Sequence, residues 1–363
     1  MVIFISIAVI ALVIIIFIRQ PKFGKKPAGM RLERIKLSPN YKNGKFQNLS
    51  HTPDLAEGVS YFTVMRKFFF GKKERNKPKD IIPSVKVNLH NLAPDENIIV
   101  WFGHSSYFIQ ADGKTILVDP VFSGSVSPLS FTNKAFKGSD AYTAEDIPAI
   151  DFLFISHDHW DHLDYKTVLN LKPKVKKVIT GLGTAEHLEY WGYDTAIIEE
   201  KDWGDTVDLS NGFTVTLTPA RHFSGRDFTR NKALWTSFVL QTPTLKLFLG
   251  GDSGYDYFFK EIGDKHGPFD FAILECGQYN EYWKYIHMMP EQVVQAATDL
   301  KAKTLMPVHW GKFSLALHAW DESIKEVTQE AKKQNMPLLT PMIGEKTDLY
   351  GNELEKEWWK EVN

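Results

Sequence analysis

The chain has 363 residues, with 43 basic and 44 acidic side chains and a formal charge of −1. This balance argues against a nucleic-acid-binding protein, which usually carries a strong basic excess. The single cysteine, Cys276, excludes an intrachain disulfide and a CxxC metal site, and we expect it to be a buried thiol. Because twelve histidines are present, a metal site in this chain would use nitrogen and oxygen ligands.

Residues 1–18 form an apolar run without charge or proline. A helix of this length roughly matches a bilayer core, so the run predicts an N-terminal transmembrane anchor. The alternative is a cleaved signal peptide, but no basic stretch precedes the run and no small-residue cleavage site follows it. Cations lie just after the run and none precedes it, which predicts by the positive-inside rule that the main domain faces the cytoplasm.

Three segments follow the predicted anchor. Residues 19–95 resemble a basic linker and N-terminal extension, because they are rich in Lys, Asn, Pro and Gly without a clear period. Residues 96–350 are predicted to form the main folded domain, because short apolar runs there end at turn residues. Residues 351–363 are predicted to be a C-terminal tail.

The apolar runs of the main domain predict strands and helices in alternation. The predicted strands are 98–102, 107–111, 115–120, 151–156, 177–180, 196–199, 206–209, 213–219, 237–242, 245–252, 269–276 and 304–310. Hairpin turns are predicted at Asp112-Gly113 and at 210–212. Hairpins beside strand–helix alternation indicate two mixed sheets with helices outside, in halves at roughly 97–220 and 230–350.

A cluster of histidine and aspartate follows the strand at 151–156. In an extended segment the side chains at i and i+2 point the same way, so His157 and His159 can bind one ion. Asp161 and His162 are then directed at a neighbouring position. Imidazole and carboxylate without thiolate suit zinc, with iron or manganese as possible substitutes. The cluster therefore predicts a site for two metal ions.

Three further candidates follow later strands. His222 and His309 each end an apolar run, and Asp252 follows Gly250 and Gly251, which leave room for close approach. In folds that alternate strands with helices, sites gather at the carboxyl ends of strands. We therefore expect these side chains to join the cluster.

The order HxHxDH, then His, Asp and His resembles the metallo-β-lactamase superfamily. The segments WFGHSSYFIQADGKTILVDPVFS, SHDHWDHLDY, TPARHFSGR, LFLGGDSGY and PVHWGKF look like the N-acylphosphatidylethanolamine-hydrolysing phospholipase D group and its bacterial relatives, from about residue 97 to 318. The resemblance implies an α+β fold, namely a four-layer αββα sandwich with two zinc ions between the sheets.

The resemblance also implies roles for single residues. It implies one zinc held by His157, His159 and His222, and a second held by Asp161, His162 and His309, with Asp252 bridging both. Asp119 would support ligand histidines, Asp164 would either orient a neighbour or begin a helix, and His104 matches a position of undefined role. The remaining histidines match nothing and are expected to be ordinary: His51, His90, His187, His266 and His318.

His287 precedes a helix that Pro290 is expected to open. The resemblance places a histidine here near the substrate phosphate, so we expect a phosphate contact or a proton donor. The alternative is a helix-start histidine that packs on Tyr285. Trp160 stands where the family often has tyrosine, and Ile286 where it has a polar residue, which leaves the exact substrate open.

The predicted function is hydrolysis of a phospholipid phosphodiester by a hydroxide held between two metal ions. The expected substrate is N-acylphosphatidylethanolamine, cleaved to phosphatidic acid and N-acylethanolamine, with Asp252, Asp161 and His287 as catalytic residues. A second hypothesis keeps the zinc hydrolase but assigns another ester, a lactone or a soluble phosphodiester. A third, a retired and membrane-tethered binding protein, is disfavoured because every expected ligand is present. The expected partners are the lipid or ester substrate and, through residues 1–18, a membrane.

Overall fold

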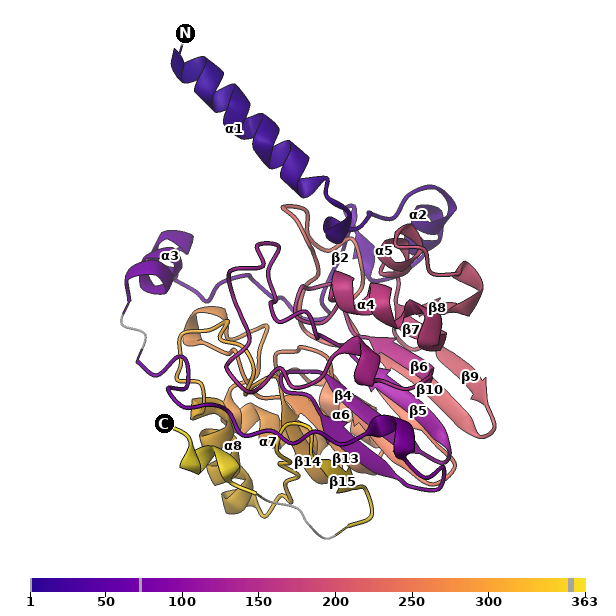
Figure 1. Cartoon of the computed structure of the whole chain (residues 1–363). Helices are drawn as coiled ribbons and strands as arrows, with labels where there is room; N and C mark the ends of the chain where they lie inside the picture. The colour runs from indigo at the N-terminus through magenta and orange to yellow at the C-terminus, as the bar shows by residue number, and fades with distance from the viewer. Residues whose placement is uncertain (1, 72–73, 352–355) are drawn as a thin grey trace.

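The computed structural model describes residues 2–71, 74–351 and 356–363. Two β-sheets form the centre of the molecule, and helices cover their outer faces (Figure 1). One sheet consists, in spatial order, of β15 (Lys346–Asp348), β3 (Ile98–Trp101), β4 (Tyr107–Ala111), β5 (Lys114–Val118), β6 (Ile150–Ile155), β7 (Val175–Gly181) and β8 (Ile198–Lys201). The other consists of β14 (Ala302–Val308), β13 (Phe269–Glu275), β12 (Lys246–Leu249), β11 (Ser237–Gln241), β10 (Phe213–Thr218) and β9 (Thr206–Ser210).

Eight α-helices are described alongside the sheets. They are α1 (Val2–Ile18), α2 (Gly29–Ile35), α3 (Tyr61–Phe70), α4 (Tyr165–Leu171), α5 (Ala185–Tyr190), α6 (Phe258–His266), α7 (Pro290–Asp299) and α8 (Glu322–Gln334). A small hairpin of β1 (Tyr41–Lys42) and β2 (Lys45–Phe46) precedes the main sheets. Both large sheets mix antiparallel with parallel pairs. Hairpins join β4 to β5 and β11 to β12, whereas a crossover through α6 joins β12 to the parallel strand β13.

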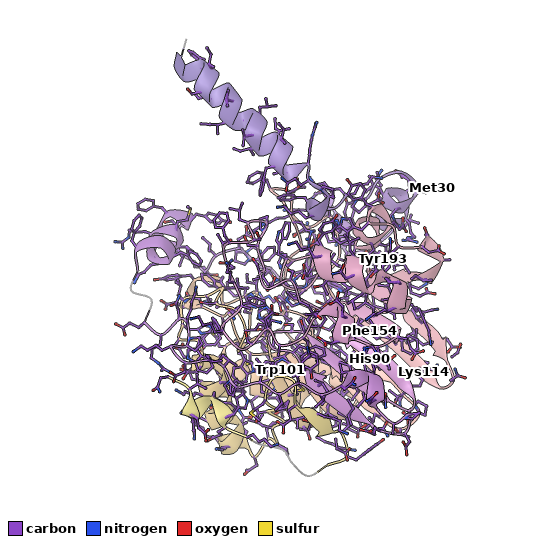
Figure 2. The ribbon with its side chains drawn as sticks, in the orientation of Figure 1. Met30, His90, Trp101, Lys114, Phe154 and Tyr193 are labelled. Carbon is purple, nitrogen blue, oxygen red and sulfur yellow. The ribbon has the colours of Figure 1, made fainter. Side chains whose placement is uncertain are left out.

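The alternation of side chains along each strand sets the layers. Ile99 and Trp101 of β3 belong to the core between the sheets, whereas Ile98 and Val100 belong to a second core beneath α4 and α5. Trp101 and Phe154, both labelled in Figure 2, are each about 1% exposed or less. Because burying one large apolar side chain is worth roughly 1.5–3 kcal/mol, these cores hold the strand ends in fixed positions.

The predicted hairpin at Asp112-Gly113 is confirmed. Ala111 pairs with Lys114, and the two turn residues have φ of 48° and 74°. Such a two-residue turn requires positive φ at both positions, which is why an Asp-Gly pair stands there.

The division into halves at 97–220 and 230–350 was wrong at its boundaries. Strand β10 pairs with β11, and β9 pairs with β10, so both belong to the second sheet, although they lie in the first half of the sequence. Strand β15 pairs with β3 at the edge of the first sheet, although it lies near the C-terminus. Side-chain periodicity reveals that a segment is a strand but not which strand it pairs with.

The transmembrane helix of the predicted fold class is not supported. Helix α1 spans 17 residues and is therefore about 25 Å long, whereas the hydrocarbon core of a bilayer is about 30 Å thick. Among the residues that the structure describes, no helix combines the length and the apolar character needed to cross a membrane. The single-pass localisation is thereby overturned, and the predicted cytoplasmic orientation, which depended on it, falls with it. Figure 1 shows α1 projecting away from the sheets.

The segment after α1 packs on the catalytic domain over much of its length. Helix α2 contacts α5 and β8 through Arg31, whose guanidinium reaches Glu186, Glu189 and Glu200. Phe46 is buried together with Trp235. The extension is thus part of the folded body rather than a free linker.

The C-terminal residues also pack on the second sheet. Trp358 stacks on Trp310 with ring centroids 5.2 Å apart, and Trp359 meets the same ring edge-on at 5.4 Å. Trp310 follows His309 directly, so this aromatic cluster supports the strand end that carries His309.

Candidate metal centre

The seven predicted metal ligands lie together at the carboxyl ends of four strands. The HxHxDH cluster follows β6, His222 follows β10, Asp252 follows β12 and His309 follows β14. Gly251 is needed for this approach, because a Cβ there would lie 2.8 Å from the Ser156 side chain and from the Thr236 carbonyl. The expectation that glycine leaves room at this point is therefore confirmed.

One group of ligand atoms comes from His157, His159, His222 and Asp252, all within 4.8 Å of one another. His157 Nε2 lies 2.9 Å from His159 Nδ1, which in turn lies 3.2 Å from His222 Nε2. The Nδ1 of His222 donates to the carbonyl of Ile286 at 2.9 Å, so Nε2 is the nitrogen left with a free lone pair. This is the arrangement that a metal ligand requires.

A second group is formed by His104, Asp161, His162 and His309, again within 4.8 Å. Asp252 stands between the two groups. Its Oδ2 lies 3.1 Å from His162 Nε2 and 3.9 Å from His157 Nε2, and its Oδ1 lies 3.0 Å from His309 Nδ1. The position of Asp252 is the one expected of a carboxylate that bridges two ions.

The polar atoms of the centre fit divalent metal ions. His162 Nε2 and Asp252 Oδ1 are buried and have no hydrogen-bond partner within the described part of the chain. His159 Nδ1 also lies about 3 Å from both His157 Nε2 and His222 Nε2. Buried polar atoms are normally paired, and a set of imidazole and carboxylate donors of this kind matches zinc, iron or manganese.

The charges of the centre favour metal binding. Burial lowers the pKa of His157, His222 and His309 well below the usual range, which keeps these rings neutral and able to coordinate. Burial opposes ionisation of Asp252, but His162 and His309 outweigh it and hold the pKa of this carboxyl well below its usual range. Asp252 is therefore an anion at neutral pH.

His162 differs from the other rings of the centre. Burial lowers its pKa, but the carboxylates of Asp252 and Asp161 outweigh burial and raise that pKa well above the usual range. Metal binding at neutral pH should therefore release a proton from this ring.

Several residues outside the two groups hold the ligands in place. Asp119 accepts from His162 Nδ1 at 2.7 Å and from the Ser156 backbone, in agreement with its expected supporting role. His104 Nε2 lies 3.0 Å from Asp161 Oδ2, which gives the histidine of undefined role a partner. Asp164 instead begins α4, where it accepts from the Lys166 backbone, so the helix-start alternative holds.

Two supporting residues were not found from the sequence. Ser105 Oγ is 2.8 Å from His309 Nδ1. Asn48 donates to the His222 carbonyl at 2.8 Å and accepts from the His222 backbone N–H at 3.1 Å. Asn48 lies in the extension, where no periodicity pointed to a role.

His287 lies at the same centre. Its ring centroid is 5.0 Å from that of His222 and 5.4 Å from that of His309, and one of its nitrogens is within 4.8 Å of ligand atoms of Asp252 and His309. Packing on Tyr285 therefore does not account for its position. Burial lowers its pKa, but Glu275 outweighs burial and raises it.

A cavity of about 260 Å³ opens onto the centre. It is lined by Asp54, Leu55, Tyr61, His159, Asp161, His222, Phe223, Arg230, Asp252, Gln278, Trp283, Ile286, His287, His309 and Leu315. Apolar side chains from the extension, from the loop after β10 and from the loops after β13 and β14 thus face the ligands. Arg230, a basic residue of this lining, is paired with Asp54 at 3.1 Å.

The other histidines lie outside the two groups. His51 and His90 are exposed, and half-buried His318 accepts from the Gln278 backbone. His187 is buried and lies 3.2 Å from Asp158 in the HxHxDH segment, so it supports that loop from behind. Cys276 is a buried free thiol, as expected.

Known proteins are similar to this chain in sequence and in fold. A family model described as "Beta-lactamase superfamily domain" matches residues 114–310. "Uncharacterized protein Rv0906" of Mycobacterium tuberculosis is 35% identical over 334 residues, which cover 89% of this chain and 88% of that protein. "N-acyl-phosphatidylethanolamine-hydrolyzing phospholipase D 1" of Caenorhabditis elegans is 29% identical over 266 residues, which cover 66% of this chain and 74% of that protein.

A solved structure has the same fold. Igni18, a metallo hydrolase from the archaeon Ignicoccus hospitalis, superposes with a TM-score of 0.53 at 19% identity, over 69% of this chain and 97% of its own. The matched family region, residues 114–310, spans more than half of the chain and contains every predicted metal ligand. The predictions of an enzyme and of this resemblance are confirmed. The chain is a metal-dependent hydrolase and belongs to the metallo-β-lactamase superfamily.

Proposed function

We propose that the chain is a dizinc phosphodiesterase that cleaves phospholipids of the N-acylphosphatidylethanolamine type to phosphatidic acid and an N-acylethanolamine. The observation that carries this proposal is the meeting of both ligand groups and His287 in one cavity with an apolar side. The likeness to the C. elegans phospholipase supports the choice of substrate.

The donor set supports two ions. In this proposal His157, His159 and His222 hold one ion, Asp161, His162 and His309 hold the other, and Asp252 contacts both. Two bound divalent ions would supply Lewis-acid activation of water and neutralise negative charge as the phosphodiester reacts. The chain's contribution is to fix the ligands, because Asp119, His104 and Asn48 restrain them from outside.

Different walls of the cavity suit the phosphate and the acyl-bearing part of the substrate. The phosphate belongs near the carboxylates and imidazoles, where His287 can donate a hydrogen bond to it or to the leaving oxygen. Phe223, Trp283 and Leu315 offer an apolar wall for the acyl-bearing part. Because Arg230 is already paired with Asp54, the lining does not favour a polyanion such as RNA.

The test is product analysis by mass spectrometry. Zinc-loaded protein is mixed with N-acylphosphatidylethanolamine in detergent micelles, and in parallel with bis(p-nitrophenyl) phosphate as a soluble diester. We expect the unsubstituted protein to release an N-acylethanolamine. His157→Ala should lower the rate by about three orders of magnitude, because metal assistance is worth several kcal/mol. His51→Ala, at an exposed histidine outside the cavity, is the matched control and should keep full activity.

Each other outcome has a defined meaning. Cleavage of the soluble diester alone would reject the lipid but keep the metal-assisted phosphodiesterase. Inactivity on both substrates with zinc bound would reject the phosphodiesterase in favour of a carboxylic ester or a lactone. An active His157→Ala variant would reject the ligand set.

A further inference from the structure

Glu275 is a buried carboxylate directly behind His287. It is the last residue of β13 and is 1% exposed. Its Oε1 accepts from the Met288 backbone at 2.8 Å and lies 3.4 Å from His287 Nδ1. Glu275 Oε2 and His287 Nδ1 are both buried without a hydrogen-bond partner within the described part of the chain, so the 3.4 Å approach brings an unpaired ring nitrogen to a carboxylate. No sequence motif pointed to Glu275.

The surroundings of Glu275 leave His287 as its ion-pair partner. A buried carboxylate is costly unless a cation or several donors compensate it. Within the residues that the structure describes, no lysine or arginine is paired with Glu275, and the ring of His287, which carries charge only when protonated, is the neighbouring basic group. Burial raises the pKa of Glu275 to about 7, although His287 acts in the opposite direction. The Nδ1 edge of His287 is therefore the group that faces this carboxylate.

This pairing fixes the direction of the imidazole. The two nitrogens of a histidine ring point away from each other, so when Nδ1 faces Glu275 the Nε2 edge is left for the cavity that His287 lines. The ring cannot turn freely, because it packs against His222 and lies at 24° to the plane of His309. A side chain held in this way presents one defined hydrogen-bonding atom to a substrate.

We propose that Glu275 is a positioning residue: it accepts the Nδ1–H of His287 and thereby directs the Nε2–H of that ring at the leaving oxygen of the substrate. This inference rests on the proposed function, in which the leaving group is an alkoxide. The P–O bond to that oxygen breaks, its electron pair goes to the oxygen, and the Nε2 proton joins it. Water supplies the oxygen of the new P–O bond, and its released proton returns to Nε2 through solvent.

The test compares two leaving groups on one lipid. The N-acylethanolamine of N-acylphosphatidylethanolamine leaves as a strongly basic alkoxide, whereas p-nitrophenol leaves from phosphatidyl-p-nitrophenol as a weak base that needs no proton. A positioning role must therefore affect the first substrate and spare the second. A merely structural role would affect both substrates equally.

Two variants separate shape from hydrogen bonding. Glu275→Met keeps the approximate size and removes the acceptor, and we expect it to lower kcat for the N-acyl lipid by about 100-fold, the lower end of general-acid effects. KM for that lipid and kcat for the p-nitrophenyl lipid should stay within about threefold. Glu275→Gln keeps an acceptor oxygen and should recover part of the loss.

A double variant tests whether the two residues act as a unit. His287→Gln should reproduce the leaving-group dependence, and adding Glu275→Met to it should cause no further loss. Equal losses on both substrates, or losses that multiply in the double variant, would overturn the proposal. So would a Glu275→Met variant with unchanged kcat.

A spectroscopic measurement tests the positioning role of Glu275 even if the proposed function fails. If the unsubstituted protein cleaves neither lipid, the proposed function fails, and the ring is then examined by nitrogen-15 NMR of histidine-labelled full chain. His287→Gln identifies the His287 signals. An Nδ1–H signal that shifts in Glu275→Met sustains the positioning role, and an unshifted signal overturns it.

Discussion

His104 shows how one side chain outside the predicted ligand set can control the centre. Its Nε2 lies 3.0 Å from Asp161 Oδ2, and its ring lies over that of His309 with centroids 4.0 Å apart. Its backbone carbonyl also accepts from the His309 backbone N–H at 2.9 Å. Asp161 and His309 thus depend on the same neighbour for their orientation.

Replacement of His104 by phenylalanine should weaken metal binding. His104→Phe keeps a ring over His309 but removes the hydrogen bond to Asp161, and partners of this kind typically contribute 10–100-fold to metal affinity. We expect about that loss for the more weakly held of the two ions, measured by competition with a chromophoric zinc chelator. His51→Phe is the matched control. Unchanged affinity in His104→Phe would contradict this role.

The residues of the metal centre differ in how readily the sequence reveals them. The HxHxDH residues are close in sequence, so their chemistry was visible without a structure. His222, Asp252 and His309 could be placed because each follows a predicted strand. Glu275 could not, since its pairing with His287 depends on the path of the intervening loop.

At the scale of elements, two arginines attach α2 to the catalytic domain, and Arg31 is the more buried of them, since Arg34 is 52% exposed and pairs with Glu200 alone. Arg31 lies 2.6 Å from Glu186 and 3.1 Å from Glu200, contacts Glu189 as well, and has a side chain only 14% exposed. Arg31→Ala would remove the one cation that all three carboxylates share, leaving Lys25 beside Glu186 and Arg34 beside Glu200. We expect a loss in free energy of unfolding on the order of 2 kcal/mol, measured by urea denaturation.

A second cation, at the C-cap of the same helix, is the control for that prediction. Lys36 forms an exposed pair with Glu33 at 2.8 Å, and such pairs are worth roughly 0–1 kcal/mol. Lys36→Ala should therefore change the urea midpoint only slightly. If Arg31→Ala and Lys36→Ala destabilise the protein equally, α2 is not held in the way described here.

The contribution of Arg31 should also depend on pH. Burial opposes ionisation of Glu186, but hydrogen bonds from Lys25 and Arg31 outweigh it and lower its pKa. A carboxyl whose pKa is depressed in the folded state stabilises the fold above its unfolded pKa, about 4.3, and loses this effect as pH falls through the folded value. The difference in stability between the unsubstituted protein and Arg31→Ala should therefore shrink below about pH 4. A difference that grows in acid would contradict the assignment.

The sequence predicts the pairing of some strands of the two sheets but not of others. Hairpin partners such as β4 and β5 could be predicted, because the Asp112-Gly113 turn fixes the register of adjacent strands. The placement of β9, β10 and β15 could not, because their pairing is decided by contacts between distant segments.

At the scale of the whole molecule, the extension at residues 19–95 contributes to the cavity in a way that the sequence did not reveal. Residues 19–95 have no hydrophobic period, yet Asn48 holds His222, and Asp54 and Tyr61 line the cavity. The catalytic cavity is therefore built from two parts of the chain that sequence analysis treated as separate. The predicted span at residues 1–18 failed for a simpler reason, since its hydropathy was evident but its helix is too short.

The number of metal ions bound per chain tests the central claim most directly. Purified full-length protein is dialysed against zinc, freed of excess ion and measured by inductively coupled plasma mass spectrometry. The ligand groups on either side of Asp252 predict two zinc ions per chain, and at most one in Asp252→Ala. A metal content near zero in the unsubstituted protein, or two ions retained in Asp252→Ala, would contradict the two-metal hydrolase described here.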